Sequence, residues 1–162
     1  MIFDTRVSRF LDELQVPFEA MFHPPAFSAT KRAKHLHISG RLVAKCVMLV
    51  TPSCHYLAIL PATHNVDLAE VERKLGETVT IATEAETTER FSDCERGALA
   101  PFGQLYGLTT LLDDSFQPGT LMVFEAQQHS VAIRMRCSDF ESLEQPKRFA
   151  FAKAQKAMKK GA

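Results

Sequence analysis

The sequence predicts an α+β fold in which a mixed, largely antiparallel or barrel-like sheet is flanked by helices. Its 162 residues, 46% hydrophobic and 23% charged, fit one soluble domain with a core of its own. Short apolar runs and amphipathic stretches follow one another in mixed order, which indicates roughly seven strands and five or six helices. Because few strict strand–helix–strand units occur, a doubly wound parallel sheet is not expected.

The first helix is predicted from apolar residues that recur every three or four positions. Asp4 or Thr5 can cap this helix. A short strand over residues 17–22 follows, and the two prolines at 24 and 25 end it. The residues that share one face of the helix are Val7, Phe10, Leu11 and Leu14.

A second helix is predicted over residues 29–36, with Ser28 as its N-cap. The helix is basic and contains no acid. A run of charge is usually a solvated face, but it can also form a local phosphate-binding surface. The cations of this helix are Lys31, Arg32, Lys34 and His35.

Residues 42–50 predict a strand buried on both faces, because eight of the nine are apolar. Lys45 stands in the middle of this strand. Burying an ammonium group is costly unless it finds a partner or water. Two interpretations stay open: the strand lines a pocket into which Lys45 points, or it is an edge strand from which Lys45 reaches solvent.

The middle of the chain predicts a hairpin and two short helices. Residues 56–61 are the next apolar strand and pair with the Lys45 strand through the turn at residues 52–53. A further strand is expected over residues 79–82. Each helix is predicted from a capping residue followed by Glu three positions later: Asp67 with Glu70, ended by Gly76, and Thr83 with Glu86, ended near Phe91.

Residues 94–107 are rich in turn formers and predict a long loop, which inside a compact domain is often functional. Strands are expected over residues 108–112, 120–125 and 129–136. The last of these alternates cleanly, so that His129 faces inward with the apolar residues. A helix capped by Ser138 follows.

The chain divides, on this prediction, into a domain of residues 1–145 and a basic C-terminal helix or tail of residues 146–162. Residues 147–160 have a helix-forming composition with six basic residues and no acid. The segment is expected to be either an auxiliary arm or a helix packed on the domain through Phe149 and Phe151.

Composition excludes several classes of function. The formal net charge is zero, so the sequence shows no overall excess of positive charge for binding a polyanion. DNA is therefore not an expected partner. The four cysteines show no CxxC and no zinc spacing, and we predict neither a metal nor a cofactor. No stretch approaches the roughly 20 apolar residues of a membrane span, and no apolar run follows the N-terminus as in a signal peptide. We therefore expect a cytoplasmic protein with reduced thiols.

The ordered set of segments resembles the YbaK/ProX family, the free-standing relatives of the bacterial prolyl-tRNA synthetase editing domain. The resemblance extends over about residues 1–143. It rests on the lysine strand at 43–49, on Tyr56–Pro61 followed by Asn65–Leu68, on the loop with Gly97 and Pro101, and on the histidine strand that begins at His129.

The resemblance implies a hydrolase that removes a wrong amino acid, such as alanine or cysteine, from the 3′ end of a proline tRNA or a related tRNA. An aminoacyl ester is already activated, so the enzyme mainly has to hold it and place a water, without a metal. Lys45 and His129 are the implied catalytic residues. The implied substrate-binding residues are Cys46, Gly97, Ala98, Leu99, Ala100, Pro101, Phe102 and Ser130.

The implied partners are a mischarged aminoacyl-tRNA and, as a second candidate, an aminoacyl-tRNA synthetase. We expect Lys31, Arg32 and Lys34 to bind the acceptor end of the tRNA. The chain departs from relatives that have a glycine-rich stretch before the histidine, because it has Ala126-Gln127-Gln128 there. The amino acid that is removed therefore stays open.

Three alternatives remain at this stage. His129 can be a hydrogen-bonded core histidine rather than a substrate contact. Cys46 and His129 can form a thiol–imidazole pair, which would make the protein an ester or thioester hydrolase of another class. The chain can also be a non-catalytic tRNA-binding or synthetase-associated module that keeps the fold.

Overall fold

The computed structural model describes residues 5–155, which form five α-helices, one short 3₁₀ helix and ten strands. The helices are α1 (Arg6–Glu13), α2 (Ala29–Leu36), α3 (Leu68–Leu75), α4 (Glu84–Arg90), the 3₁₀ helix (Gly103–Tyr106) and α5 (Cys137–Glu144). The strands are β1 (Glu19–Phe22), β2 (Ala44–Val50), β3 (His55–Pro61), β4 (His64–Val66), β5 (Thr80–Ile81), β6 (Thr109–Asp113), β7 (Leu121–Glu125), β8 (Val131–Arg136), β9 (Lys147–Phe149) and β10 (Ala152–Ala154).

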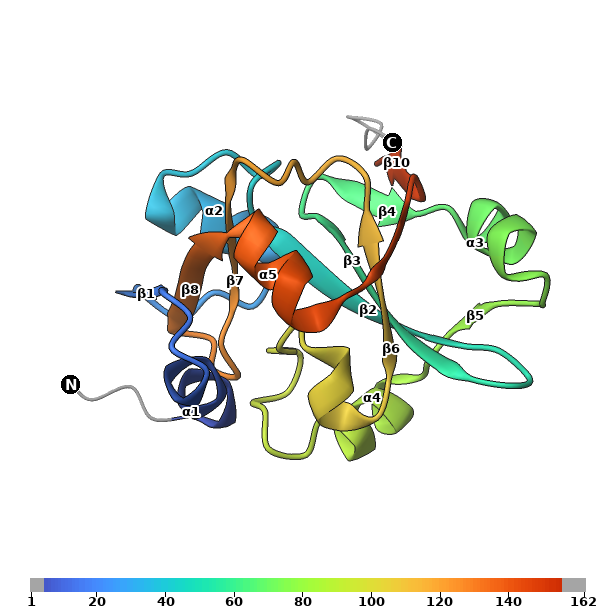
Figure 1. The fold of residues 1–162 in the computed structure, drawn as a ribbon, viewed down its shortest axis with the longest axis horizontal. Coiled ribbons are helices and arrows are strands. Elements are labelled where there is room, and N and C mark those ends of the chain that lie inside the picture. The colour runs from blue at the N-terminus through green and yellow to red at the C-terminus, as the bar shows by residue number, and fades with distance from the viewer. Residues whose placement is uncertain (1–4, 156–162) are drawn as a thin grey trace, which may run out of the picture.

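The strands form one five-stranded sheet, one three-stranded sheet and one two-stranded ribbon. The large sheet has the order β5-β2-β3-β6-β9, with an antiparallel β2–β3 hairpin and parallel β3–β6 and β6–β9 pairs. The small sheet, β1-β8-β7, is antiparallel and lies beside the large one (Figure 1). A parallel bridge between Val43 and Val123 joins the two sheets. The predicted α+β fold with a mixed sheet is confirmed.

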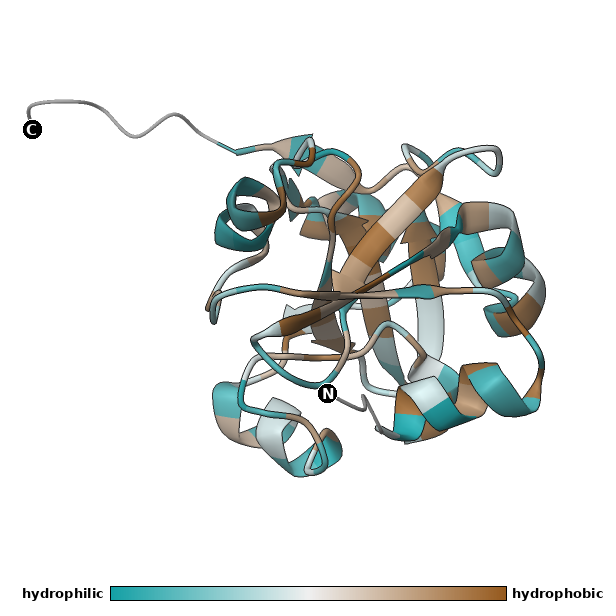
Figure 2. Cartoon of the chain, turned by 90° about the vertical axis from the view of Figure 1, so that its left-hand side faces the viewer, coloured by the Kyte–Doolittle hydropathy of each residue, from teal (hydrophilic) through white to brown (hydrophobic). Residues whose placement is uncertain are grey.

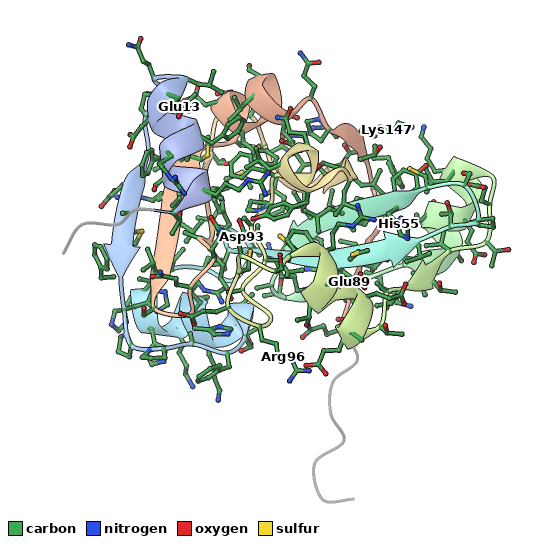
Figure 3. All side chains as sticks on the ribbon, turned by 90° about the horizontal axis from the view of Figure 1, so that it is seen from below. Glu13, His55, Glu89, Asp93, Arg96 and Lys147 are labelled. Atoms are coloured by element: carbon green, nitrogen blue, oxygen red, sulfur yellow. The ribbon has the colours of Figure 1, made fainter. Side chains whose placement is uncertain are left out.

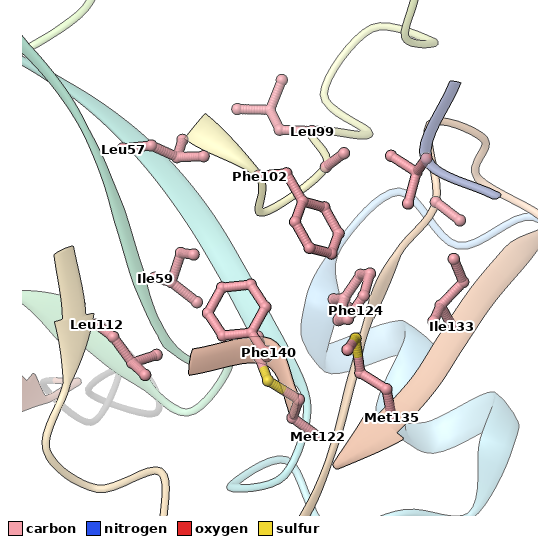
Figure 4. Packing of buried hydrophobic residues seen from close by; sticks show 14 of the residues in the cluster. Leu57, Ile59, Leu99, Phe102, Leu112, Met122, Phe124, Ile133, Met135 and Phe140 are labelled. Carbon is pink, nitrogen blue, oxygen red and sulfur yellow. The ribbon is translucent and has the colours of Figure 1, made fainter. Parts of the chain in front are cut away.

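The main core fills the space between the two sheets. The ring of Phe102 lies 5.6 Å from that of Phe124 and 5.4 Å from that of Phe140, measured between centroids (Figure 4). A second apolar cluster, which includes Leu60, Val71 and Phe151, covers the other face of the large sheet. The apolar colour accordingly gathers in the central strands while the helices turn polar faces outward (Figure 2).

β2 is an open edge where Lys45 stands, although it is an inner strand at its other end. β5 pairs with β2 only at Leu49 and Val50. Over the first part of the strand β2 pairs within its sheet only with β3, where Lys45 lies opposite Leu60. Both interpretations of Lys45 therefore apply, because the strand is an open edge at this position and the same edge lines the pocket described below.

Most elements lie where the sequence predicts them. Thr5 caps α1, Ser28 caps α2 and Asp67 caps α3, and Thr83 with Glu86 forms a capping box for α4. The Lys45 hairpin is also confirmed.

The helix predicted from the composition of residues 147–160 does not form in its described part, because Lys147–Phe149 form β9 and Ala152–Ala154 form β10. β9 pairs with β6 and β10 pairs with β4, so the sheets supply backbone partners that outweigh the helix-forming composition. Phe149 and Phe151 are buried in the second cluster. The remaining basic residues of the predicted tail, at 156–160, lie outside the described residues.

Two smaller predictions also differ from the structure. The last strand of the small sheet begins at Val131, so His129 and Ser130 belong to the turn before it. α5 begins at Cys137 without a side-chain cap, whereas Ser138 was the predicted cap. Within residues 5–155 no helix is long and apolar enough to cross a membrane.

Candidate functional site

The site is a pocket at the junction of the two sheets, with about 350 Å³ of space that opens to solvent. The start of α2, the open edge of β2, the loop before the 3₁₀ helix and the end of β7 all contribute to its wall. Segments far apart in the sequence thus meet at one place. The lining residues are Phe27, Ser28, Ala29, Arg32, Ala44, Lys45, Cys46, Gly97, Leu99 and Glu125.

Lys45 is half-buried in this pocket. Its Nζ donates to Oδ1 of Asn65 over 3.3 Å, and within residues 5–155 it has no carboxylate partner. Burial lowers the pKa of its ammonium group below the ordinary 10.5. A cation without a counter-charge beside a pocket is available to an anionic or oxyanionic ligand.

Cys46 contributes a thiol to the pocket wall. Burial raises the pKa of this thiol to about 12, against a smaller lowering effect of the nearby Arg32 guanidinium. The thiolate is the nucleophilic form of cysteine, and it is scarce at neutral pH when the pKa is that high. Cys46 lines the pocket wall, and its raised pKa argues against the alternative of a cysteine hydrolase.

The predicted substrate-binding loop is divided between pocket and core. Gly97 and Leu99 line the pocket, and Gly97 has a φ of +83°, a left-handed conformation that glycine adopts without strain. Asp93 and Arg96, on the same loop, are both exposed, and Arg96 lies at the outer edge of the molecule (Figure 3). The loop residues that are buried as its anchors are Ala98, Ala100, Pro101 and Phe102.

His129 lies behind the pocket wall and is not among the lining residues. Its Nδ1 is 3.2 Å from the carbonyl oxygen of Ala26, and its Nε2 is 2.7 Å from that of Arg96. Each ring nitrogen of His129 therefore faces a backbone carbonyl oxygen, one from each of two loops. Glu125 Oε2, 4.0 Å from Nδ1, supplies a negative charge beside it. His129 therefore connects the segment at Ala26 with the loop at Arg96.

The thiol–imidazole pair of Cys46 and His129 is absent from the described contacts. Both ring nitrogens of His129 face backbone carbonyls instead. Ser130, next in the chain, also lies outside the pocket lining, and its carbonyl oxygen accepts from the backbone N–H of His23 over 3.0 Å. Both predicted site residues in the turn before β8, His129 and Ser130, therefore bind the segment at residues 23–26 through hydrogen bonds.

The prediction that Arg32 binds tRNA is wrong, because its guanidinium lies inside the protein. The side chain is 1% exposed and forms an ion pair with Glu125, and burial lowers the pKa of the guanidinium to about 10. Its Nη2 also lies 3.5 Å from the carbonyl oxygen of Ala26. Lys31 and Lys34, the other two cations of the prediction, are exposed.

The inward position of Arg32 had a signal in the sequence. Ala29, Arg32, Ala33 and Leu36 have the i, i+3, i+4, i+7 spacing of a buried helix face. Glu125, which ends an apolar strand, is its partner and was not predicted as a site residue. Opposite charges on two inward faces are the pattern that indicates a buried ion pair.

Gln127 is a further structural residue that sequence reasoning missed. It adopts a left-handed backbone with φ +70°, the conformation that a glycine would take freely. Its side chain accepts from Val7 N–H over 3.0 Å and donates to the Asp93 carbonyl over 3.2 Å. The polar side chain of Gln127 thus connects α1 to the loop that ends at the pocket.

The sequence matches the aminoacyl-tRNA editing domain family over residues 23–143. No curated protein matches it at a significant level. The structure is similar to the crystal structure of the hypothetical protein APE2540, with a TM-score of 0.85 at 10% identity, covering 92% of this chain and 100% of the other. It is also similar to that of a candidate trans-editing enzyme for prolyl-tRNA synthetase, with a TM-score of 0.74 at 18% identity, covering 85% and 87%.

The structural similarities show the fold, and the sequence match covers more than half of the chain, including the pocket residues from Phe27 to Glu125. The resemblance to the YbaK/ProX family is thereby confirmed. This chain belongs to the aminoacyl-tRNA editing domain family.

Proposed function

We propose that this protein is a trans-acting deacylase that hydrolyses the ester between a small amino acid and the 3′ end of a mischarged tRNA. The observation that carries the proposal is the convergence, in one pocket, of the Lys45 ammonium, whose only described partner is the Asn65 amide, and the Gly97 backbone. These are the two features that the resemblance assigns to substrate binding and catalysis.

The reaction needs little from the protein beyond position and charge. Water attacks the ester carbonyl, the carbonyl oxygen becomes negative, and the ribose hydroxyl leaves with a proton. The ammonium of Lys45 stabilises that negative charge or holds the adjoining ribose and phosphate. Gly97, exposed at the pocket, lets the substrate approach the backbone closely because it has no side chain.

The dimensions and lining of the pocket favour a small amino acid. Ala44, Cys46 and Leu99 form apolar wall, and the Arg32–Glu125 pair lies against the same space. A bulky side chain would have to displace residues of the main core, since Leu99 packs within it. We assign no nucleophilic side chain, because the Cys46 thiol stays protonated.

The tRNA itself is proposed to dock on the exposed cations of α2. Lys31 and Lys34 are exposed on the helix whose first residues line the pocket. Phosphate contacts from such residues provide affinity without reading sequence.

The test is a panel of tRNAs mischarged with different amino acids, with the corresponding amino-acid ethyl esters as controls. We expect rapid release of a small amino acid from tRNA and slow release from the ethyl esters. Release from ethyl esters alone would contradict the proposal. Binding of charged tRNA without release of any amino acid would instead support a non-catalytic or synthetase-associated module.

A further inference from the structure

Phe27 stands at the rim of the pocket with its ring in solvent. At 73% it has the largest exposure among the large apolar side chains of residues 5–155. Its ring also lines the pocket beside Ser28 and Lys45. An exposed phenyl ring contributes little to the core, and its place at the mouth of a pocket makes one of its faces available to a ligand with an apolar face.

The ring is held in place by the segments around it. Ala26, just before Phe27, is fully buried, and its backbone N–H donates to the His129 carbonyl over 2.9 Å. Ser28, just after it, caps α2 by accepting from Lys31 N–H over 3.1 Å. One side of the Phe27 ring packs against the His129 imidazole, with 4.7 Å between centroids. Little conformational freedom remains to be lost when a ligand covers the outer side.

We propose that Phe27 is the stacking platform for the terminal adenine base of the tRNA. This proposal rests on the proposed function. The ester that is cleaved sits on the ribose of the terminal nucleotide, so an aminoacyl group in the pocket keeps that nucleotide's base at the pocket mouth. Every base has a flat π-face, and aromatic side chains bind single-stranded nucleotides through it.

The charges around Phe27 favour a nucleotide over an apolar partner. Lys31 lies in the first turn of α2, one turn from Phe27, and Lys45 lines the same pocket. A ring flanked by cations matches a base flanked by phosphates. A purely apolar peptide would leave these cations without partners.

The experiment measures stacking directly and independently of hydrolysis. The probe is an RNA acceptor-stem minihelix whose terminal adenine is replaced by 2-aminopurine and whose 3′ end carries alanine through a stable amide. The fluorescence of 2-aminopurine falls when the base stacks on an aromatic ring. The variants are Phe27→Ala, Phe27→Leu and Phe27→Trp, and Phe22→Ala is the matched control because Phe22 is also exposed but lies outside the pocket.

We expect wild-type protein and Phe27→Trp to quench the probe. Phe27→Ala and Phe27→Leu should lose the quenching and bind the minihelix about tenfold more weakly, while Phe22→Ala behaves as wild type. In turnover of mischarged tRNA, Phe27→Ala should raise KM about tenfold and change kcat little, because the platform is remote from the reacting ester.

Two outcomes would overturn the stacking proposal: no quenching by the wild type, or equal quenching and affinity in Phe27→Ala. Quenching that depends on Phe27 in a protein that hydrolyses no mischarged tRNA would contradict the proposed function alone. Hydrolysis by the wild type with Phe27-independent binding would contradict the stacking alone. The Phe27→Leu variant keeps the bulk against His129, so a folding defect of Phe27→Ala would still leave the test decisive.

Discussion

Two sets of charges border the same pocket and are treated in opposite ways. Lys45, at the open edge of β2, is half-buried and has a single amide as its partner. At the rear of the pocket, Arg32 and Glu125 in its lining and His129 behind them are each less than 10% exposed and lie together. A buried charge needs a counter-charge, and Arg32 has one in Glu125, although Arg32 Nε and Glu125 Oε2 have no hydrogen-bond partner of their own. Lys45 has no carboxylate partner among residues 5–155, and it stands in front, where a substrate can reach it.

The rear cluster also shapes the front of the pocket. The carbonyl oxygen of Ala26 receives both Arg32 Nη2, at 3.5 Å, and His129 Nδ1, at 3.2 Å. His129 reaches the Arg96 carbonyl through its other nitrogen. Arg32 and His129 thereby contact the segment that carries Phe27, and His129 also contacts the loop that carries Gly97. In this pocket, the charge of Arg32 is paired with Glu125 and helps to position the segment that carries Phe27, whereas the charge of Lys45 has no counter-ion among the described residues and can interact with a substrate.

The largest effect is expected from breaking the rear pair. Glu125→Ala leaves the Arg32 guanidinium buried without a counter-ion, and we expect a loss of about 3–5 kcal/mol in the free energy of unfolding. Urea denaturation of the purified variants measures it. The double variant Arg32→Met with Glu125→Leu removes both charges and should recover most of the loss. A Glu125→Ala protein as stable as the wild type would show that the Arg32–Glu125 ion pair does not stabilise the fold.

For Lys45, at the front of the pocket, we expect a large effect on activity and little effect on stability. Lys45→Ala is expected to lower deacylation more than about a hundredfold, the scale of losing one transition-state charge contact. It should leave the stability unchanged or slightly raised, because the folded state disfavours the charged form of Lys45. Single-turnover hydrolysis and urea denaturation of the same preparation measure the two effects. Near-wild-type hydrolysis would exclude Lys45 from the reaction.

The lowered pKa of Lys45 also predicts a pH dependence. Enzymatic hydrolysis, corrected for the spontaneous reaction, should fall on the alkaline side at a pH below 10.5, as the ammonium loses its proton. Over that range the unfolded chain binds more protons than the folded one, so the contribution of Lys45 to stability rises with pH. Lys45→Arg keeps the charge and should move the alkaline fall to higher pH. An unchanged profile in Lys45→Arg would assign the fall to another group.

The front of the pocket could be predicted from the sequence better than the back. Lys45 stands out because a charge interrupts an apolar strand, and Gly97 because turn formers gather around it. Arg32 and Glu125 are a pair only in space, since 93 positions separate them, and the helix periodicity that indicates an inward Arg32 does not identify its partner. Single-sequence patterns describe one element at a time, whereas this pair depends on how α2 packs on β7.

The C-terminal segment shows the same limit at the level of the fold. The composition of residues 147–154 favours a helix by local propensity. The segment becomes β9 and β10 because β6 and β4 offer unpaired backbone and because Phe149 and Phe151 fit the second cluster. Helices with a capping residue, such as α3 and α4, were predictable because their signals are local.

A moderate effect is expected from the exposed cations of α2. Lys31→Gln with Lys34→Gln should weaken tRNA binding and flatten the dependence of log Kd on log salt by about 1.4, the single-strand value for two phosphate contacts. Hydrolysis measured at several salt concentrations tests this. Truncation after residue 155 is the matched comparison for the C-terminal cations, because it keeps β9 and β10. An unchanged salt slope in the α2 variant would place tRNA docking elsewhere.

The smallest effect is expected from the thiol between front and back. Cys46→Ser keeps the size of the side chain and replaces sulfur by oxygen. Because burial raises the pKa of the thiol to about 12, we expect little thiolate at neutral pH, and the thiolate is the attacking form. We therefore expect kcat to change by less than about threefold, whereas loss of a true nucleophile costs several orders of magnitude. A thousandfold loss in Cys46→Ser, with normal stability and normal binding of the 2-aminopurine minihelix, would instead make the front of this pocket a cysteine hydrolase site.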